Sequence, residues 1–128
     1  MRRLEVNATD KKSVLVVIRR SPYGSSLAKA SLDVALAAAV FEQPVSLLFM
    51  GDGVLQLLAE QESRAIGVKN IGRLLASLPL YDIESVYVDA RAAAHYGVDL
   101  SQAPVVMQAL DGSGVHQLMA GCDHLLGF

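Results

Sequence analysis

The sequence lacks tryptophan, has one cysteine and is poor in charge. Charged residues make up 19% of the 128 residues, with 11 Lys and Arg against 13 Asp and Glu. The lone Cys122 allows no internal disulfide, which is typical of a protein from a reducing cytoplasm. The near balance of charge indicates no nucleic-acid-binding surface spread over the whole protein, so any RNA contact is expected to be local or made through a partner.

Long hydrophobic runs are also missing. The apolar run from Val34 to Phe41 is far shorter than the ~20 residues that a membrane-spanning helix needs. Arg2 and Arg3 follow Met1, but no apolar stretch comes after them, so we expect no secretory signal. These absences predict a cytoplasmic protein that does not act on a membrane.

Apolar residues, by contrast, are abundant. They make up 52% of the chain, against roughly 45–50% in an average domain, which excludes intrinsic disorder. The length suits one domain that buries its core without metals or disulfides. The apolar surplus exceeds the need of a single core and predicts a large surface buried against a partner.

Predicted strands and helices alternate from Ser13 onward. Residues 1–12 are polar and aperiodic and are expected to form a loose tail, which leaves residues 13–128 as one domain. Short apolar runs predict strands at 14–18, 45–50, 85–88, 104–107 and 123–128. Helices are expected from Ser25 or Ser26 to Phe41, from Gly51, from Ile71 to a stop at Pro79, at 90–96 and at 111–120. This order predicts an α/β fold with a parallel sheet and helices on both faces, a three-layer sandwich.

The first predicted helix has an unusual second half. From Ala35 to Val40 it carries almost no polar side chain. A helix with an apolar surface all round is normally buried, so we expect more than one of its sides to be covered.

Two turns are candidate ligand sites, because open α/β folds bind ligands at the carboxyl ends of their strands. The first holds Ser21, Tyr23, Gly24 and Ser25, whose hydroxyls and backbone amides suit an anion at a helix start. The second is Gly51-Asp52-Gly53. Neither has the glycine spacing or the lysine of a nucleotide-binding loop, and a tight turn with a helix cap is the favoured explanation of both.

Cysteine, aspartate and histidine side chains are further candidates for chemistry. Cys122 has no adjacent cation or helix N-terminus to stabilise a thiolate, so a structural role is favoured. Asp89 follows the third strand and is either an acid or base at the ligand edge or, more simply, a helix cap. His95, His116 and His124 show no ligand spacing, so we expect no metal and no other cofactor.

Four segments together give the chain a recognisable pattern. They are Ser21-Pro22-Tyr23-Gly24, Asp52-Gly53-Val54-Leu55-Gln56-Leu57-Leu58, Leu80-Tyr81-Asp82-Ile83-Glu84 and Asp123-His124-Leu125-Leu126-Gly127-Phe128. Through them the chain resembles the DsrE/DsrF-like superfamily and, within it, the TusC (DsrF-like) branch. The second and third segments are the specific ones, and the resemblance extends over nearly all of residues 13–128.

The resemblance implies a cytoplasmic dimer of heterotrimers in which TusD-like and TusB-like subunits are the partners. Such a complex receives persulfide sulfur and passes it to a TusE-like acceptor, toward 2-thiolation of the tRNA wobble uridine, with tRNA contacted only indirectly. In the related catalytic subunit a cysteine after the third strand carries the persulfide, and the matching position here is Asp89. A carboxylate cannot hold a sulfane sulfur, so the resemblance implies a noncatalytic subunit. Tyr81 and Asp82 join the two turns as candidate loops at the sheet edge or a subunit interface.

Two other functions stay open at this point. A DsrF-like subunit in dissimilatory sulfur oxidation fits the same segments, and neighbouring sulfite-reductase genes would favour it. A homo-oligomeric protein that binds a small anion at the turns of residues 21–26 and 51–53 also fits. It predicts that phosphate compounds raise the melting temperature of the protein.

Overall fold

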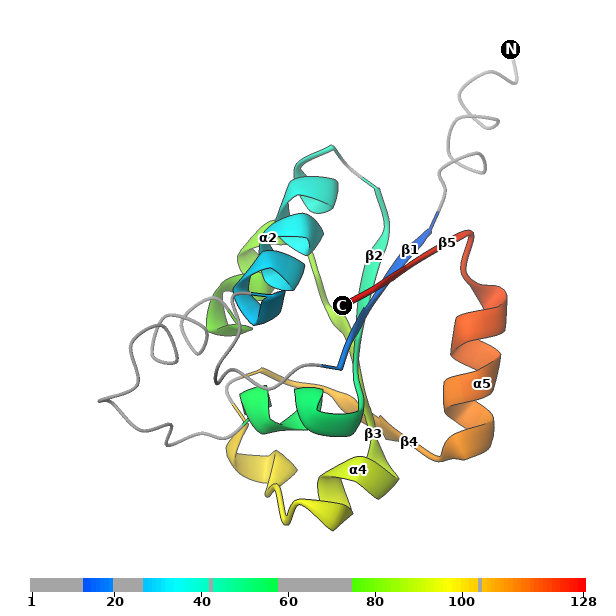
Figure 1. The fold of residues 1–128 in the computed structure, drawn as a ribbon. Coiled ribbons are helices and arrows are strands. Elements are labelled where there is room, and N and C mark those ends of the chain that lie inside the picture. The colour runs from blue at the N-terminus through cyan, green and yellow to red at the C-terminus, as the bar shows by residue number, and fades with distance from the viewer. Residues whose placement is uncertain (1–12, 20–26, 42, 58–74, 104) are drawn as a thin grey trace.

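The computed structural model describes residues 13–128 except for 20–26, 42, 58–74 and 104. The strands of the described part form one parallel sheet in the order β4-β3-β2-β1-β5. They are β1 (Val14–Ile18), β2 (Val45–Phe49), β3 (Ser85–Asp89), β4 (Gln108–Leu110) and β5 (His124–Gly127). The helices are α2 (Leu27–Val40), α4 (Ala90–His95) and α5 (Gly112–Gly121), with 3₁₀ helices η1 (Gly51–Leu57), η2 (Leu78–Tyr81) and η3 (Leu100–Gln102). Figure 1 shows α2 and α5 on opposite faces of the sheet, which confirms the predicted α/β fold.

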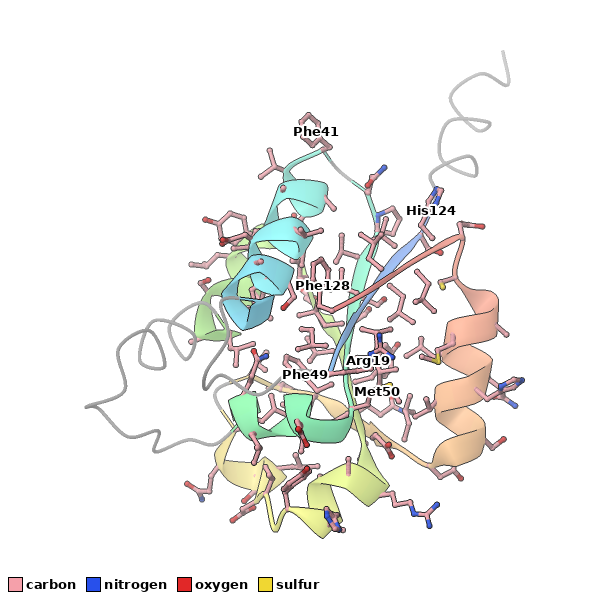
Figure 2. All side chains as sticks on the ribbon, in the orientation of Figure 1. Arg19, Phe41, Phe49, Met50, His124 and Phe128 are labelled. Atoms are coloured by element: carbon pink, nitrogen blue, oxygen red, sulfur yellow. The ribbon has the colours of Figure 1, made fainter. Side chains whose placement is uncertain are left out.

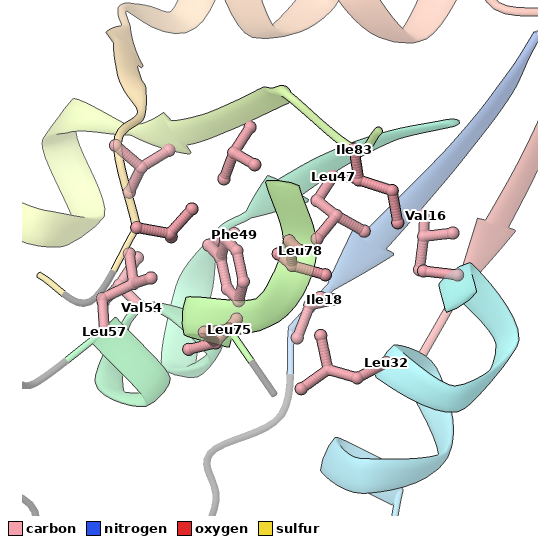
Figure 3. Close-up of a cluster of buried hydrophobic side chains, with 14 of the residues drawn as sticks. Val16, Ile18, Leu32, Leu47, Phe49, Val54, Leu57, Leu75, Leu78 and Ile83 are labelled. Carbon is pink, nitrogen blue, oxygen red and sulfur yellow. The ribbon is translucent and has the colours of Figure 1, made fainter. Parts of the chain in front are cut away.

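The main core lies between the sheet and the layer that holds α2 and η2. Val16, Ile18, Leu47 and Phe49 point into it from the two central strands, and Leu32 meets them from α2 (Figure 3). All five side chains are fully buried. Burial of one such side chain contributes about 2 kcal/mol to the free energy of unfolding, which explains why the central strands carry continuous apolar runs.

A smaller core lies on the other face of the sheet, beneath α5. Side chains alternate along a strand, so Leu15 and Val17 point to this face, where they pack with Leu48 and Val115. Within the described ranges, α5 is the helix that covers this face. In the part of the chain that the structure describes, one helix of ten residues thus covers this face.

One side of α2 stays uncovered in the described part of the chain. Leu32 and Ala35 are fully buried, whereas Asp33, Ala37 and Val40 form an exposed stripe at helical spacing. The side of α2 that faces the core is buried, but the expected cover on a second side is not seen among the described residues. None of the residues that the structure describes covers the rest of the apolar surface of α2.

One strand is displaced from its predicted position. The fourth strand is not at 104–107 but at Gln108–Leu110, because an edge strand with largely exposed side chains needs few apolar residues. Val105, part of the apolar segment taken for this strand, is buried in the main core outside the sheet. The helix predicted to stop at Pro79 ends its α-helical part at Ser77, and Pro79 lies in the first turn of the 3₁₀ helix η2, where proline is tolerated.

A reciprocal pair of polar groups closes the amino ends of β1 and β5. The backbone N–H and the hydroxyl of Ser13 donate to the Asp123 carboxylate at 2.9 and 3.2 Å, and the Asp123 N–H donates to the Ser13 hydroxyl at 3.0 Å. The expected tail, residues 1–12, lies outside the described residues. None of the described helices has the length and hydropathy required to traverse a bilayer.

Candidate functional site

The candidate residues divide between the two edges of the sheet. Because the strands are parallel, their carboxyl ends meet at one edge, here called the carboxyl edge, where Gly51–Gly53 and Asp89 lie. Tyr81 and Asp82 precede β3 and therefore lie at the opposite, amino edge. In Figure 1 the carboxyl edge is the lower one, beside η1 and α4. Ser21, Tyr23, Gly24 and Ser25 lie outside the described residues.

The backbone geometry explains why glycine stands at positions 51 and 53, just after β2. The Met50 N–H donates to the Ile18 carbonyl at 3.0 Å, which brings η1 against the end of β1. A Cβ on Gly53 would lie 2.0 Å from the Ile18 carbonyl oxygen, so only glycine fits. Gly51 has a φ of +54°, a left-handed conformation that glycine adopts without strain. The close turn therefore gives both glycines a structural role.

Asp52 projects from this turn and contacts a residue that the sequence analysis did not select. Its carboxylate accepts a hydrogen bond from the Tyr96 hydroxyl, which joins η1 to the end of α4. This hydrogen bond is the main reason that the pKa of Tyr96 is raised, since the carboxylate favours the protonated phenol. The His95 ring packs edge-on against Tyr96, with ring centroids 4.9 Å apart. The two residues that bond are 44 positions apart, so no local spacing could indicate the contact.

Asp89 ends β3 and caps the helix that follows. Its carboxylate accepts a hydrogen bond from the Arg91 backbone N–H at 3.1 Å, as a helix N-cap does. The half-buried side chain thus has the capping role that the sequence favoured. One carboxylate oxygen is engaged by α4, a helix of six residues that Gly97 terminates with a φ of +66°.

Arg19 adds a positive charge to the carboxyl edge, and no motif in the sequence indicated it as a site residue. Its backbone N–H donates to the Phe128 carbonyl at 3.0 Å, which extends the pairing of β1 with β5. A Cβ on Gly127 would lie 3.1 Å from an Arg19 Nη atom, so the guanidinium lies over the glycine. Figure 2 shows Arg19 near Met50, where β1 and β2 end.

Cys122, the one cysteine of the chain, lies at the amino edge. It follows α5 and is half-buried in the smaller core beside Leu118. Its thiol donates to the Met119 carbonyl at 3.2 Å. The thiol and Asp89 are therefore at opposite ends of the strands.

The chemistry that the carboxyl edge offers is charge and hydrogen bonding. Its described side chains include the Asp52 and Asp89 carboxylates, the Tyr96 hydroxyl and the Arg19 guanidinium. No three His, Cys, Asp or Glu side chains of the described residues lie close enough to hold a metal ion. His95, His116 and His124 are on three separate elements, α4, α5 and β5.

Known proteins match this chain over almost its whole length. Residues 12–128 match the model of the DsrE/DsrF-like family. A protein named TusC homolog from Pseudomonas aeruginosa is 30% identical over 115 residues, which are 90% of this chain and 97% of that protein. A TusC homolog from Vibrio parahaemolyticus is 33% identical over 112 residues, 88% of this chain and 95% of that protein.

Two further similarities concern a sulfur-oxidation protein and a solved structure. The intracellular sulfur oxidation protein DsrF from Allochromatium vinosum is 30% identical over 131 residues, 91% of this chain and 96% of its own. The crystal structure of the YchN protein from E. coli superposes with a TM-score of 0.70 at 20% identity, covering 91% of this chain and 99% of that one. The structural likeness shows a shared fold.

Proposed function

Because this chain belongs to the DsrE/DsrF-like family, we propose that it is a noncatalytic subunit of a cytoplasmic sulfur-relay complex that supports 2-thiolation of the tRNA wobble uridine. Its partners in this proposal are TusD-like and TusB-like subunits in a heterohexamer. The complex passes sulfur to a TusE-like acceptor, and tRNA is reached only through the complex. The two TusC homologues at 30% and 33% identity support this function over the homo-oligomeric anion-binding alternative.

The position of the single cysteine is the observation that carries the noncatalytic role. Sulfur in a persulfide relay is held on a cysteine thiolate, which must be accessible to donor and acceptor. Cys122 is half-buried, and its thiol is engaged by the Met119 carbonyl at the amino edge. The last position of β3 holds Asp89, whose carboxylate caps α4 and cannot form a persulfide. In this proposal the chain helps to complete and position the persulfide site of a sister subunit.

Deletion of the gene tests the tRNA function. We expect 2-thiouridine in digested tRNA, measured by mass spectrometry, to disappear and to return when the wild-type gene is supplied on a plasmid. Unchanged thiolation in the deletion strain would contradict the tRNA assignment.

Sulfur loading of the purified complex tests the noncatalytic role. After treatment with a persulfide donor, intact-mass spectrometry is expected to show an added sulfur atom on a sister subunit and none on this chain. An added sulfur that is lost on replacement of Cys122 by serine would show instead that this chain carries sulfur itself.

A role in sulfur oxidation is the second candidate, favoured by the 30% identity to the DsrF protein of Allochromatium vinosum. Sulfite-reductase genes beside this gene would support it. In that case a deletion strain is expected to lose oxidation of stored sulfur and to keep its tRNA thiolation.

A further inference from the structure

The amino edge carries apolar side chains that the proposed role in sulfur relay leaves unexplained. Val40 ends α2 and Phe41 follows it, and they are 65% and 79% exposed. Leu80 and Tyr81 in η2 are 84% and 43% exposed. The two segments meet because α2 packs against η2. Figure 2 shows Phe41 directed away from the body of the molecule. We call these four residues the amino-edge patch.

A hollow of about 320 Å³ opens beside the patch, between the end of α2 and the residues before β3. Its walls include Ala39, Pro44 and Tyr81. The hollow is large enough to receive a bulky side chain from another protein, the kind of anchor that contributes most of the energy of an interface.

The apolar surface continues along the same edge. A second hollow, of about 440 Å³, is lined by Pro79, Ile83, Val105 and Val106, and Ile83 also lines the first hollow. Val106 is 90% exposed. Segments that precede β2, β3 and β4 therefore line two neighbouring hollows, and Val106 extends the amino-edge patch to a strip of five exposed side chains.

The size of this strip suits a protein interface. The five exposed side chains present on the order of 500 Å² of apolar surface, near the upper end of what monomers expose. A stable interface buries about 800 Å² per partner, of which about 65% is apolar in its core. The strip can thus supply the apolar centre of one interface of standard size.

The charge at its margin decides between possible occupants. Asp82 and Glu84 are exposed and line the two hollows, one each. The arginine side chains that the structure describes, Arg19 and Arg91, both lie at the carboxyl edge. A second copy related by a twofold axis would present the same acidic margin, and like charges facing each other cost several kcal/mol.

We propose that the amino-edge patch docks a different protein subunit, which inserts an apolar side chain into the hollow beside Tyr81 and places Lys or Arg opposite Asp82 and Glu84. The inference rests on the proposed function, which supplies the partner subunits. It assigns the two edges of the sheet different roles, with the amino edge for assembly and the carboxyl edge for the sister subunit's sulfur site.

Site-directed photocrosslinking in the assembled complex tests this surface. In a Cys122→Ser background, the purified Leu80→Cys variant is labelled with a thiol-reactive benzophenone. The purified sister subunits are then added, and the complex is illuminated. Because Leu80 is largely exposed, the label is expected to leave the fold intact. We expect a crosslink from position 80 to a sister subunit. The matched control, Ala94→Cys on the exposed surface of α4 at the other edge, is expected to give no crosslink to the same segment of that subunit.

A charge reversal tests the acidic margin. Glu84→Lys is expected to weaken assembly about tenfold, with the difference shrinking at high salt, since a like-charge contact replaces an attraction. Asp33→Lys makes the same charge change two turns away from Val40 on α2 and is expected to leave assembly unchanged.

The outcomes separate this inference from the proposed function. An intact complex without a crosslink from position 80, or a crosslink from position 80 to a second copy of this chain, overturns the inference and leaves the proposed function standing. If the wild-type chain forms no complex with any sister subunit, the proposed function and the inference both fail.

Discussion

Two glycines on either side of Asp52 illustrate different demands on single residues. Gly53→Ala would place a Cβ 2.0 Å from the Ile18 carbonyl oxygen, a backbone atom that cannot move without displacing β1. We expect this change to lower the free energy of unfolding by more than about 3 kcal/mol. Gly51→Ala meets no atom within 4 Å and costs only the left-handed conformation, about 1 kcal/mol. Urea unfolding of both variants measures the difference, and equal losses would contradict the close approach of η1 to β1.

The hydrogen bond from Tyr96 to Asp52 predicts a dependence on alkaline pH. The pKa of Tyr96 is raised by this bond, so its contribution to stability is complete below the ordinary tyrosine pKa of about 10 and is lost as pH rises through the raised pKa. Tyr96→Phe is therefore expected to be less stable than the wild type at neutral pH, and this difference in stability is expected to shrink as pH rises through the raised pKa.

Absorbance measures the titration directly. The difference between wild-type and Tyr96→Phe titrations isolates one phenol among the four tyrosines of the chain, and it is expected to ionise above the ordinary range. Tyr81→Phe serves as a control at an exposed tyrosine of the other edge. A Tyr96 phenol that ionises at the ordinary value would show that the bond to Asp52 is absent in solution.

Single residues of the candidate site could be predicted only where the cause is local. The capping role of Asp89 follows from its place between a strand and a helix, and the structure confirms it. The contact of Tyr96 with Asp52 and the position of Arg19 over Gly127 depend on how distant elements pack. No pattern within a short window of sequence contains that information.

Among the elements, central strands were easier to predict than edge strands. β1 and β2 are buried on both faces and must be apolar throughout, so their sequences identify them. β4 is paired on one side only, and Gln108 and Ala109 are exposed, so its position is set by pairing with β3 and not by hydrophobicity. The apolar residues before it drew the prediction away, because Val105 and Val106 belong to the core and the surface strip instead.

Helix α5 carries a prediction of its own, because it covers the smaller core in the described part of the chain. Asp111 caps it by accepting a hydrogen bond from the Gly114 N–H at 2.7 Å, and Gly112 and Gly114 in its first turn make the helix weak without a cap. Asp111→Ala is expected to cost about 1 kcal/mol, whereas Asp111→Asn keeps a capping side chain and costs less.

Hydrogen exchange locates that loss. Amide protection is expected to fall in α5 in the Asp111→Ala variant, while the protection of β1 and β2 changes only with global stability. A uniform loss over all elements would indicate that α5 unfolds only together with the main core.

At the scale of the whole molecule, the order of strands and helices sufficed to predict a parallel α/β sheet. The same order also fixes which turns share an edge, since a turn before a strand lies opposite a turn after one. The sequence prediction placed Tyr81 and Asp82 in one group with Gly51–Gly53. In the structure the first two lie at the amino edge and the glycine turn lies at the carboxyl edge. What sequence could not give is the exposure of Phe41 and Leu80, which depends on how α2 and η2 meet.

The separation of Cys122 from Asp89 leads to a last prediction about the complex. Cys122 lies at the amino end of the sheet, half-buried in the smaller core, with its thiol engaged by a backbone carbonyl. Cys122→Ser keeps a hydroxyl donor for that carbonyl, so we expect a loss of about 1 kcal/mol in the free energy of unfolding. Because sulfur transfer in the proposed relay uses the cysteine of a sister subunit, the rate of transfer by the assembled complex is expected to stay at the wild-type level.

The matched control replaces the persulfide cysteine of the sister subunit by serine, which is expected to abolish transfer in an otherwise intact complex. Transfer is followed with radiolabelled sulfur passing from a donor to the acceptor protein, at a temperature where both complexes are fully folded. If Cys122→Ser stops transfer while assembly and melting temperature stay near the wild type, sulfur must pass through this chain. The amino edge would then hold a sulfur site, and assembly would have to use another surface.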